Sequence, residues 1–99
     1  MKNINVQANA VGQLEIIGEL SFNTVPKLRG IGCRFITKNE RPIFNLQGAI
    51  PKDNSGIALL TAWTRFAKKL GKNVSFINLP NQLRDVIKLS GLEDILPIK

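Results

Sequence analysis

Strand patterns and helical patterns alternate along the sequence, and this alternation restricts the fold more than any other feature. Four segments have the period-two alternation or the short apolar runs typical of strands: residues 4–8, 14–20, 43–46 and 74–79. Three segments have the three- and four-residue apolar spacing typical of amphipathic helices: the stretch after residue 24, residues 55–70 and residues 81–90. The order strand, strand, helix, strand, helix, strand, helix predicts an α/β domain in which helices cover one four-stranded sheet. We expect a hairpin followed by right-handed crossovers, so the sheet should be mixed.

The length and the apolar content of the chain fit one compact domain. With 99 residues and 43% hydrophobic side chains, we expect a single domain over residues 1–99 with one small core. No run approaches the ~18 to 20 apolar residues of a membrane span, and no apolar secretory signal follows the N-terminus. The single cysteine, Cys33, fits a reducing compartment and is interpreted as a small buried apolar side chain. These features predict a cytoplasmic protein.

The sequence lacks the residues that most catalytic and metal sites use. It contains no histidine, which excludes the Ser-His and Cys-His nucleophile pairs and removes the commonest metal ligand. It also contains no Gly-x-x-x-x-Gly-Lys-[Ser/Thr] loop for nucleotide phosphates. We therefore predict a protein that is not an enzyme and that holds no cofactor or metal.

The helix predicted after residue 24 carries two glycines in its middle. Asn23 or Thr24 has a side chain suited to the N-cap, and Pro26 fits the first turn, where its missing N–H costs nothing. Asn23 and Thr24 are also candidates for a polar site at the strand ends, although capping is favoured. Gly30 and Gly32 each weaken a helix by roughly 1 kcal/mol relative to Ala. We expect either close packing at these glycines or a poorly formed middle of the helix.

The polar triplet Asp53-Asn54-Ser55 opens the longest helical pattern of the chain. Each of its side chains has an oxygen that can accept a hydrogen bond from an unpaired N–H of the first helical turn, so helix capping is one interpretation. In open α/β sheets, functional sites lie beyond the carboxyl ends of strands, where loops meet helix N-termini. The polar triplet follows the strand at residues 43–46, and it is therefore also a candidate functional site.

The helical pattern at residues 55–70 separates a core face from an exposed edge. Helical spacing assigns three large apolar side chains to the core: Leu59, Leu60 and Trp63. The alternative for Trp63 is an interface anchor, and the core placement is favoured. Three other side chains are expected nearer the exposed edge and are candidate interface residues: Ile57, Ala58 and Thr61.

The chain is strongly basic. Fourteen Lys and Arg against seven Asp and Glu give a net charge of +7, which favours acidic proteins, nucleic acid or anionic lipid surfaces as partners. Four of the basic residues cluster near the end of the helix predicted at 55–70: Arg65, Lys68, Lys69 and Lys72. Either an acidic partner surface or an ordinary solvated helix end explains this cluster. Nucleic-acid binding is disfavoured, because the five Phe and one Trp fall mostly at core positions and leave no stacking platform.

Several short segments stand in order over essentially the whole chain: Gly18-Glu19-Leu20, Asp53-Asn54-Ser55-Gly56-Ile57-Ala58-Leu59-Leu60, Lys68-Lys69-Leu70-Gly71-Lys72 and Lys88-Leu89-Ser90-Gly91-Leu92. Together they resemble the STAS domain family, which includes the bacterial anti-sigma-factor antagonists. Within that family, three segments are most similar to the small STAS subunit of the Mla phospholipid-transport ABC system: Gly56-Ile57-Ala58-Leu59-Leu60, Phe76-Ile77-Asn78-Leu79-Pro80 and Leu92-Glu93-Asp94-Ile95-Leu96-Pro97.

The resemblance implies a single STAS-type domain that works as a non-catalytic cytoplasmic subunit at the inner face of a Gram-negative inner membrane. The subunit would stabilise or regulate its partner, the ATPase of a phospholipid-transport ABC complex. That complex would maintain outer-membrane lipid asymmetry. Nucleic-acid binding is not implied, and membrane association would come only through the complex. The implied partner-binding residues begin at the polar triplet: Asp53, Asn54, Ser55, Gly56, Ile57, Ala58 and Thr61.

The alternative implied by the resemblance is an anti-sigma-factor antagonist that acts by partner switching. In that branch the residue after the aspartate accepts a phosphoryl group from a kinase that is also the anti-sigma factor. Asn54 occupies this position here, and its amide cannot form a stable phosphoester. Ser55 is then the candidate phosphorylation site, where phosphate would add roughly −1.5 to −2 charges at a helix N-terminus. A constitutive contact is the favoured interpretation.

Overall fold

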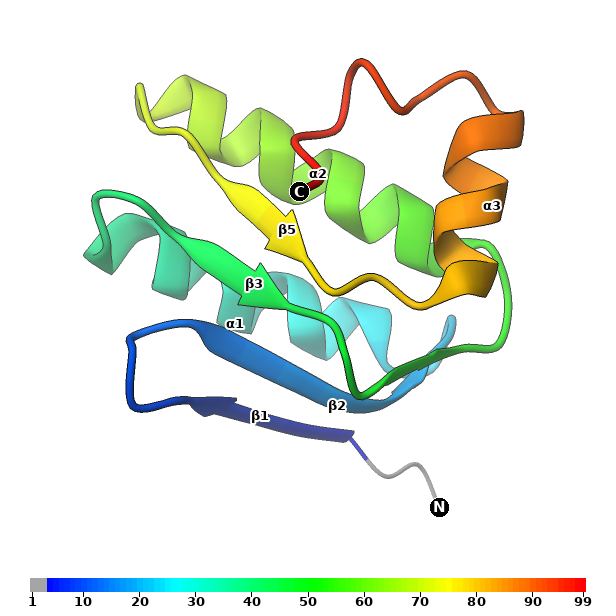
Figure 1. The fold of residues 1–99 in the computed structure, drawn as a ribbon. Coiled ribbons are helices and arrows are strands. Elements are labelled where there is room, and N and C mark those ends of the chain that lie inside the picture. The colour runs from blue at the N-terminus through cyan, green and yellow to red at the C-terminus, as the bar shows by residue number, and fades with distance from the viewer. Residues whose placement is uncertain (1–3) are drawn as a thin grey trace.

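The computed structural model describes residues 4–99 of the chain (Figure 1). The first elements are β1 (Ile4–Ala8), β2 (Leu14–Leu20) and α1 (Val25–Lys38). They are followed by β3 (Ile43–Asn45), β4 (Ala49–Pro51) and α2 (Ser55–Lys69). The last elements are β5 (Ser75–Ile77) and α3 (Asn81–Leu89). The three helices lie where the amphipathic spacing predicts them.

The strands form one mixed sheet. β1 pairs with β2 in antiparallel orientation, as the hairpin prediction requires. β2 then pairs in parallel with β3, and β3 pairs in parallel with β5, so the sheet order is β1-β2-β3-β5. The predicted α/β class, the mixed sheet and the hairpin are therefore confirmed.

The sheet contains one strand more than the four that were predicted. β4 pairs in parallel with the second half of β2, from Gly18 opposite Ala49 to Leu20 opposite Pro51, whereas β3 pairs with the first half. A turn separates the two short strands, and in it the Ala49 N–H donates to the Leu46 carbonyl at 3.0 Å. A three-residue strand that ends in proline is too short to show a period of two. Its pairing with β2 is what makes it a strand.

The helices cover one face of the sheet and one of its ends. α1 and α2 lie behind the sheet in Figure 1, and α3 lies beyond the ends of β3 and β5. Side chains of β2 alternate accordingly, because Leu14 and Ile16 are buried under the helices while Ile17 is 39% exposed on the other face. None of the helices formed by residues 4–99 covers that other face in Figure 1.

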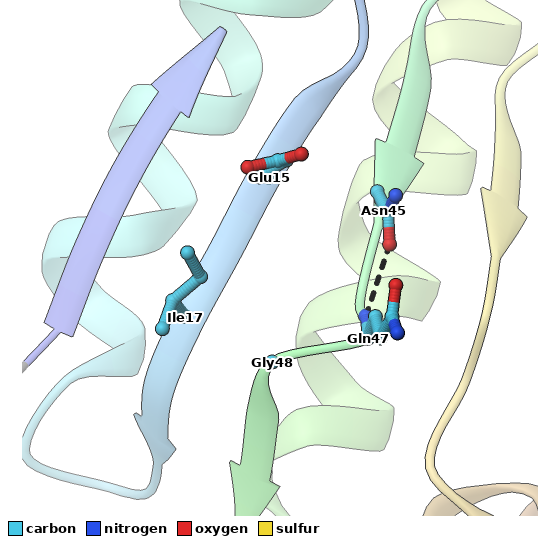
Figure 2. Close-up of a pocket in the computed structure, with 5 residues that line it drawn as sticks. All are labelled: Glu15, Ile17, Asn45, Gln47 and Gly48. Carbon is cyan, nitrogen blue, oxygen red and sulfur yellow. Dashed lines mark hydrogen bonds between the residues drawn. The ribbon is translucent and has the colours of Figure 1, made fainter. Parts of the chain in front are cut away.

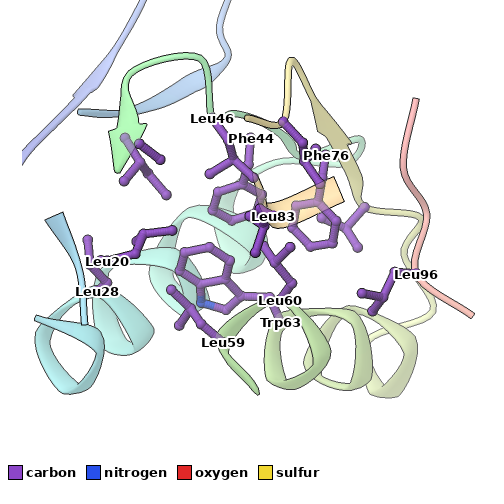
Figure 3. Close-up of a cluster of buried hydrophobic side chains, with 14 of the residues drawn as sticks. Leu20, Leu28, Phe44, Leu46, Leu59, Leu60, Trp63, Phe76, Leu83 and Leu96 are labelled. Carbon is purple, nitrogen blue, oxygen red and sulfur yellow. The ribbon is translucent and has the colours of Figure 1, made fainter. Parts of the chain in front are cut away.

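Three aromatic rings form the centre of the core (Figure 3). Phe44 of β3 stacks on Trp63 of α2 with ring centroids 4.3 Å apart and planes 13° apart. Phe76 of β5 lies 5.6 Å from Phe44 between ring centroids. All three side chains are fully buried, so the core placement of Trp63 is confirmed. The indole Nε1–H of Trp63 donates to the backbone oxygen of Arg29 at 3.2 Å, which satisfies the one polar group of the ring.

Close packing explains one of the two glycines in α1. A Cβ atom at Gly32 would lie 2.1 Å from Cε2 of Trp63, which is far inside van der Waals contact. At Gly30 the nearest atom to such a Cβ would be Nη1 of Arg34, at 3.7 Å. The helix is continuous through both positions. Of the two expectations for this helix, close packing is therefore confirmed at Gly32, and the poorly formed middle is wrong.

Cys33 corrects one burial prediction. The side chain is half-buried rather than buried. It packs against the edge of the core but also lines a hollow on the outer surface between α1 and α2. The helical periodicity places it next to the core face, and only the position of α2 decides how much of it is covered.

Candidate functional site

The polar triplet lies between the end of β4 and the start of α2, beside α3. A cleft of about 200 Å³ opens there, which we call the corner cleft. One wall is the segment from Pro51 to Asn54 together with Ile57, and the facing wall is α3. The side chains that α3 contributes are Gln82, Leu83 and Val86. The corner cleft thus combines polar groups at a helix N-terminus with an apolar wall.

The carboxylate of Asp53 joins three parts of this corner. Its Oδ1 accepts a hydrogen bond from the backbone N–H of Ser55 at 2.9 Å and a second one from the Ser55 hydroxyl. Its Oδ2 accepts a hydrogen bond from the backbone N–H of Phe22 at 3.2 Å. Phe22 belongs to the loop between β2 and α1, so one side chain ties that loop to the start of α2.

These hydrogen-bond donors also lower the pKa of Asp53. The Ser55 hydroxyl, followed by the Ser55 N–H, holds the pKa of the Asp53 carboxyl below its usual value, and the Phe22 N–H acts in the same direction. Hydrogen bonds to the charged form favour that form. Asp53 is therefore a carboxylate at neutral pH, and it accepts hydrogen bonds without donating any.

Helix capping takes a different form from the one predicted. Thr24 and Asn54 occupy the N-cap positions of α1 and α2, but neither side chain bonds to its helix. The Thr24 hydroxyl donates instead to the backbone oxygen of Glu19 at 2.8 Å and is buried. At α2 the helix-start bond comes from Asp53, one residue before the N-cap. Asn54 therefore presents an exposed amide at the mouth of the corner cleft.

The predicted partner-binding residues fall into three groups. Three of them line the corner cleft: Asp53, Asn54 and Ile57. Two are buried beneath it: Ser55, which is 6% exposed, and Gly56. The remaining two, Ala58 and Thr61, line a separate hollow between α1 and α2. As predicted, all three edge residues of α2 are more exposed than its core residues.

Gly56 allows the start of α2 to approach the sheet closely. A Cβ atom at this position would lie 3.3 Å from Cδ1 of Leu20 on β2 and 3.7 Å from Cδ1 of Leu83 on α3. Gly56 is buried beneath the polar triplet.

Residues 5–97 match the family model described as "Mlab, STAS domain". The chain belongs to the STAS domain family. No protein in the curated comparison matches it.

Solved structures share the fold of this STAS domain at low sequence identity. The anti-sigma factor antagonist SpoIIAA in its unphosphorylated form is 20% identical, with a TM-score of 0.73 over 98% of this chain and 86% of that chain. The phosphorylated form of the Bacillus cell fate determinant SpoIIAA is 20% identical, with a TM-score of 0.70 over 98% of this chain and 89% of that one. An anti-sigma factor antagonist from Mycobacterium paratuberculosis is 17% identical, with a TM-score of 0.77 over 99% and 85%. These similarities show the fold.

Several residues of the corner cleft were not found from the sequence of this STAS domain. Phe22 does not line the cleft, but its backbone N–H donates to Asp53, and no side-chain pattern reveals that contribution. Gln82 resembles an ordinary exposed surface residue, and Val86 belongs to the apolar stripe of its helix, so neither position by itself indicates a cleft. Asn23 and Thr24, which were considered for the corner, do not line it.

A second hollow of about 250 Å³ lies on the uncovered face of the sheet (Figure 2). It sits at the turn between β3 and β4, between Glu15 and Ile17 of β2 on one side and Asn45 and Gln47 on the other. The Gln47 N–H donates to Oδ1 of Asn45 at 3.0 Å, which closes the turn. This hollow results from the interruption between β3 and β4.

Two kinds of feature are absent from the residues from Ile4 onward. In that part of the STAS domain, no three acidic, cysteine or histidine side chains come together as a metal site would require. The same residues contain no helix long and apolar enough to span a membrane.

Proposed function

We propose that this STAS domain is a non-catalytic cytoplasmic subunit that binds the ATPase of a phospholipid-transport ABC complex and stabilises or regulates it. The complex would sit at the inner membrane and maintain the lipid asymmetry of the outer membrane. The family description, "Mlab, STAS domain", supports this branch of the family. The observation that carries the proposal is Asn54, whose exposed amide stands where partner switching needs a phosphoacceptor hydroxyl.

The residues around the corner cleft are held in one arrangement before a partner binds, which favours a constitutive contact. Asp53 holds the loop of Phe22 and the first turn of α2 in one arrangement, so little conformational entropy is lost when a partner binds. The amide of Asn54 offers both a donor and an acceptor. Ile57 and Val86 add apolar surface within the same cleft. A polar anchor beside an apolar wall suits a protein side chain inserted by the ATPase.

Asn54→Arg tests the proposal, because it places a bulky charge in the cleft mouth without touching a buried residue. The variant and the wild type are co-expressed with the phospholipid-transporter ATPase of the same genome and copurified. We expect the variant to bind roughly tenfold or more weakly, since an unpaired charge is desolvated at the interface. Gln47→Arg, at an exposed position on the other face of the sheet, should bind as the wild type does. Equal binding by Asn54→Arg and the wild type would refute the proposed interface.

The second candidate function is that of an anti-sigma-factor antagonist, because SpoIIAA has the same fold in phosphorylated and unphosphorylated forms. The acceptor would be Ser55. Its hydroxyl is buried and donates to Asp53, so a kinase must first break that bond. A phosphate there would stand next to the Asp53 carboxylate, and the two negative charges would repel each other.

Mass spectrometry after incubation with the kinase-type anti-sigma factor of the same genome and ATP tests this alternative. Phosphate on Ser55 of the wild type, and none on Ser55→Ala, would establish switching. We expect no phosphate on either protein. An Asn54→Ser variant, which supplies the hydroxyl at the usual position, should still bind the ATPase.

A further inference from the structure

A long groove runs along the outer surface between α1 and α2. It consists of two adjoining hollows of about 500 Å³ and about 250 Å³, both lined by Cys33 and Phe66. The larger hollow begins at Ala58, and the groove ends near Lys38 on α1 and Lys69 on α2. The stretch from Ala58 to Lys69 corresponds to about 17 Å of helix at ~1.5 Å per residue. We call this surface the interhelical groove.

The two helices that form the interhelical groove carry only positive charge. α1 contributes Lys27, Arg29, Arg34 and Lys38, and α2 contributes Arg65, Lys68 and Lys69. Neither helix contains an Asp or a Glu, because all seven acidic residues of the chain lie elsewhere. Positive side chains therefore lie on both sides of the groove: the predicted basic cluster on α2 and the cations of α1.

Most of these charges have no partner within residues 4–99. No ion pair or side-chain hydrogen bond of the described residues engages Arg29, Arg34, Arg65 or Lys69, all of which are exposed. Lys72 differs, because its Nζ donates to the carbonyls of Ile36 and Thr37 at 2.8 Å each. Lys72 therefore satisfies the end of α1 and does not belong to the interhelical groove.

The floor of the interhelical groove is apolar and made mainly of small side chains. Apart from its cations, the larger hollow is lined by Ala58, Thr61, Ala62 and Phe66 of α2 and by Cys33 of α1. Small residues allow the backbone of another segment to approach, and Phe66 offers an apolar contact. The rims carry Arg29 on one side and Arg65 on the other. An apolar floor between positive rims is complementary to a segment with one apolar face and carboxylates along its edges.

We propose that the interhelical groove binds an acidic amphipathic helix of a partner protein, about three turns long. An anionic membrane would need large apolar side chains projecting beside the cations. Among the exposed large apolar side chains of the described residues, only Leu70 and Phe22 adjoin these two helices, after α2 and before α1, and neither lines the groove. The groove is separate from the corner cleft, and although Ala58 and Thr61 of the implied partner-binding set line it, the proposal rests on the groove's own residues and not on the ATPase contact.

The test uses the whole of residues 1–99 and a synthetic probe. The probe is a fluorescent 14-residue peptide with leucines at helical spacing on one face and glutamates on the other. A peptide of the same composition in scrambled order controls for charge alone. Vesicles of phosphatidylglycerol control for an anionic lipid surface. Binding is measured by fluorescence anisotropy at low and at high salt, and the contacted residues are located by NMR shift changes.

Two variants with equal net charge distinguish binding through the groove cations from attraction by the net charge of the whole protein. Arg29→Gln/Arg65→Gln/Lys69→Gln removes three charges from the interhelical groove, and Arg41→Gln/Arg84→Gln/Lys88→Gln removes three exposed charges elsewhere. We expect the first variant to bind the amphipathic probe roughly tenfold more weakly, since each of the three exposed pairs contributes a factor of about two in affinity. The second variant should stay within about twofold of the wild type, because its distant charges are screened.

Three results would overturn the proposal. The first is an absence of binding by the amphipathic probe at low salt. The second is equal binding by the scrambled peptide, or equal weakening by the two triple variants, since either would show attraction by net charge alone. The third is binding of phosphatidylglycerol vesicles, but not of the probe, through the groove cations. Shift changes at Ala62 and Phe66 on addition of the amphipathic probe would support it.

Discussion

The contact between Gly32 and Trp63 allows a sharp test of how the core is packed. Gly32→Ala places a Cβ 2.1 Å from the indole, while Gly30→Ala places one with no neighbour nearer than 3.7 Å. Both substitutions gain helix propensity, worth ~1 kcal/mol. The pair therefore differs in tertiary packing and hardly in local structure.

The expected magnitude follows from what the indole would lose by moving. Trp63 is stacked on Phe44 at 4.3 Å and bonded through Nε1 to the Arg29 carbonyl, so it cannot shift without breaking good contacts. Overpacking costs ~1 to 3 kcal/mol, and a lost hydrogen bond costs ~1 kcal/mol. After the gain in helix propensity, we expect Gly32→Ala to lower the free energy of unfolding by about 2 kcal/mol. Gly30→Ala should raise it by about 0.5 to 1 kcal/mol.

Urea unfolding followed by tryptophan fluorescence measures both effects, because Trp63 is the one tryptophan of the chain. The Gly32→Ala/Trp63→Phe double variant and Trp63→Phe alone, which contain no tryptophan and are therefore followed by circular dichroism, are the internal check, since the smaller ring should remove much of the clash and make the two substitutions non-additive. If Gly32→Ala were as stable as the wild type with an unchanged emission spectrum, the packing argument would fail.

Two further predictions concern the ends of the helices. Because the pKa of Asp53 is lowered in the fold, its carboxylate stabilises the protein above the unfolded pKa of about 4, and this stabilisation disappears as the pH falls through the folded value. The difference in unfolding free energy between the wild type and Asp53→Asn should therefore be constant from about pH 5 to pH 7 and shrink below about pH 4; a difference independent of pH would contradict this. Lys72→Met removes the two bonds to the last carbonyls of α1 and should cost about 1 kcal/mol in urea unfolding, whereas Lys68→Met, at an exposed position, should stay within about 0.5 kcal/mol. Equal effects of the two lysine variants would show that Lys72 contributes no specific bond.

Local patterns predicted most of the fold. The period of the apolar residues determined where α2 and α3 form and which side of α2 carries Trp63, because each helix buries a face that its own spacing defines. The mixed sheet followed from the order of the elements. β4 could not be recognised, since its three residues become a strand only through pairing with Gly18 to Leu20.

The candidate site was predicted in position but not in detail. Residue types alone predicted that polar groups stand at the start of α2, because Asp, Asn and Ser suit a helix N-terminus. They did not reveal that Asp53 makes the bonds while Asn54 stays exposed. The bond from Phe22 to Asp53 spans 31 residues, and no local pattern encodes it.

The surfaces of the molecule show most clearly which features the sequence determines locally and which depend on tertiary packing. The sequence by itself determined the net charge of +7 and the basic end of α2. Only the tertiary structure placed α1 beside α2, joined their cations around one apolar floor, and separated Ala58 and Thr61 from the corner cleft. Periodicity determines which face of a helix is apolar, because the spacing of side chains is a local property. A groove or a cleft depends on which two elements meet, and that is decided by the packing of the whole chain.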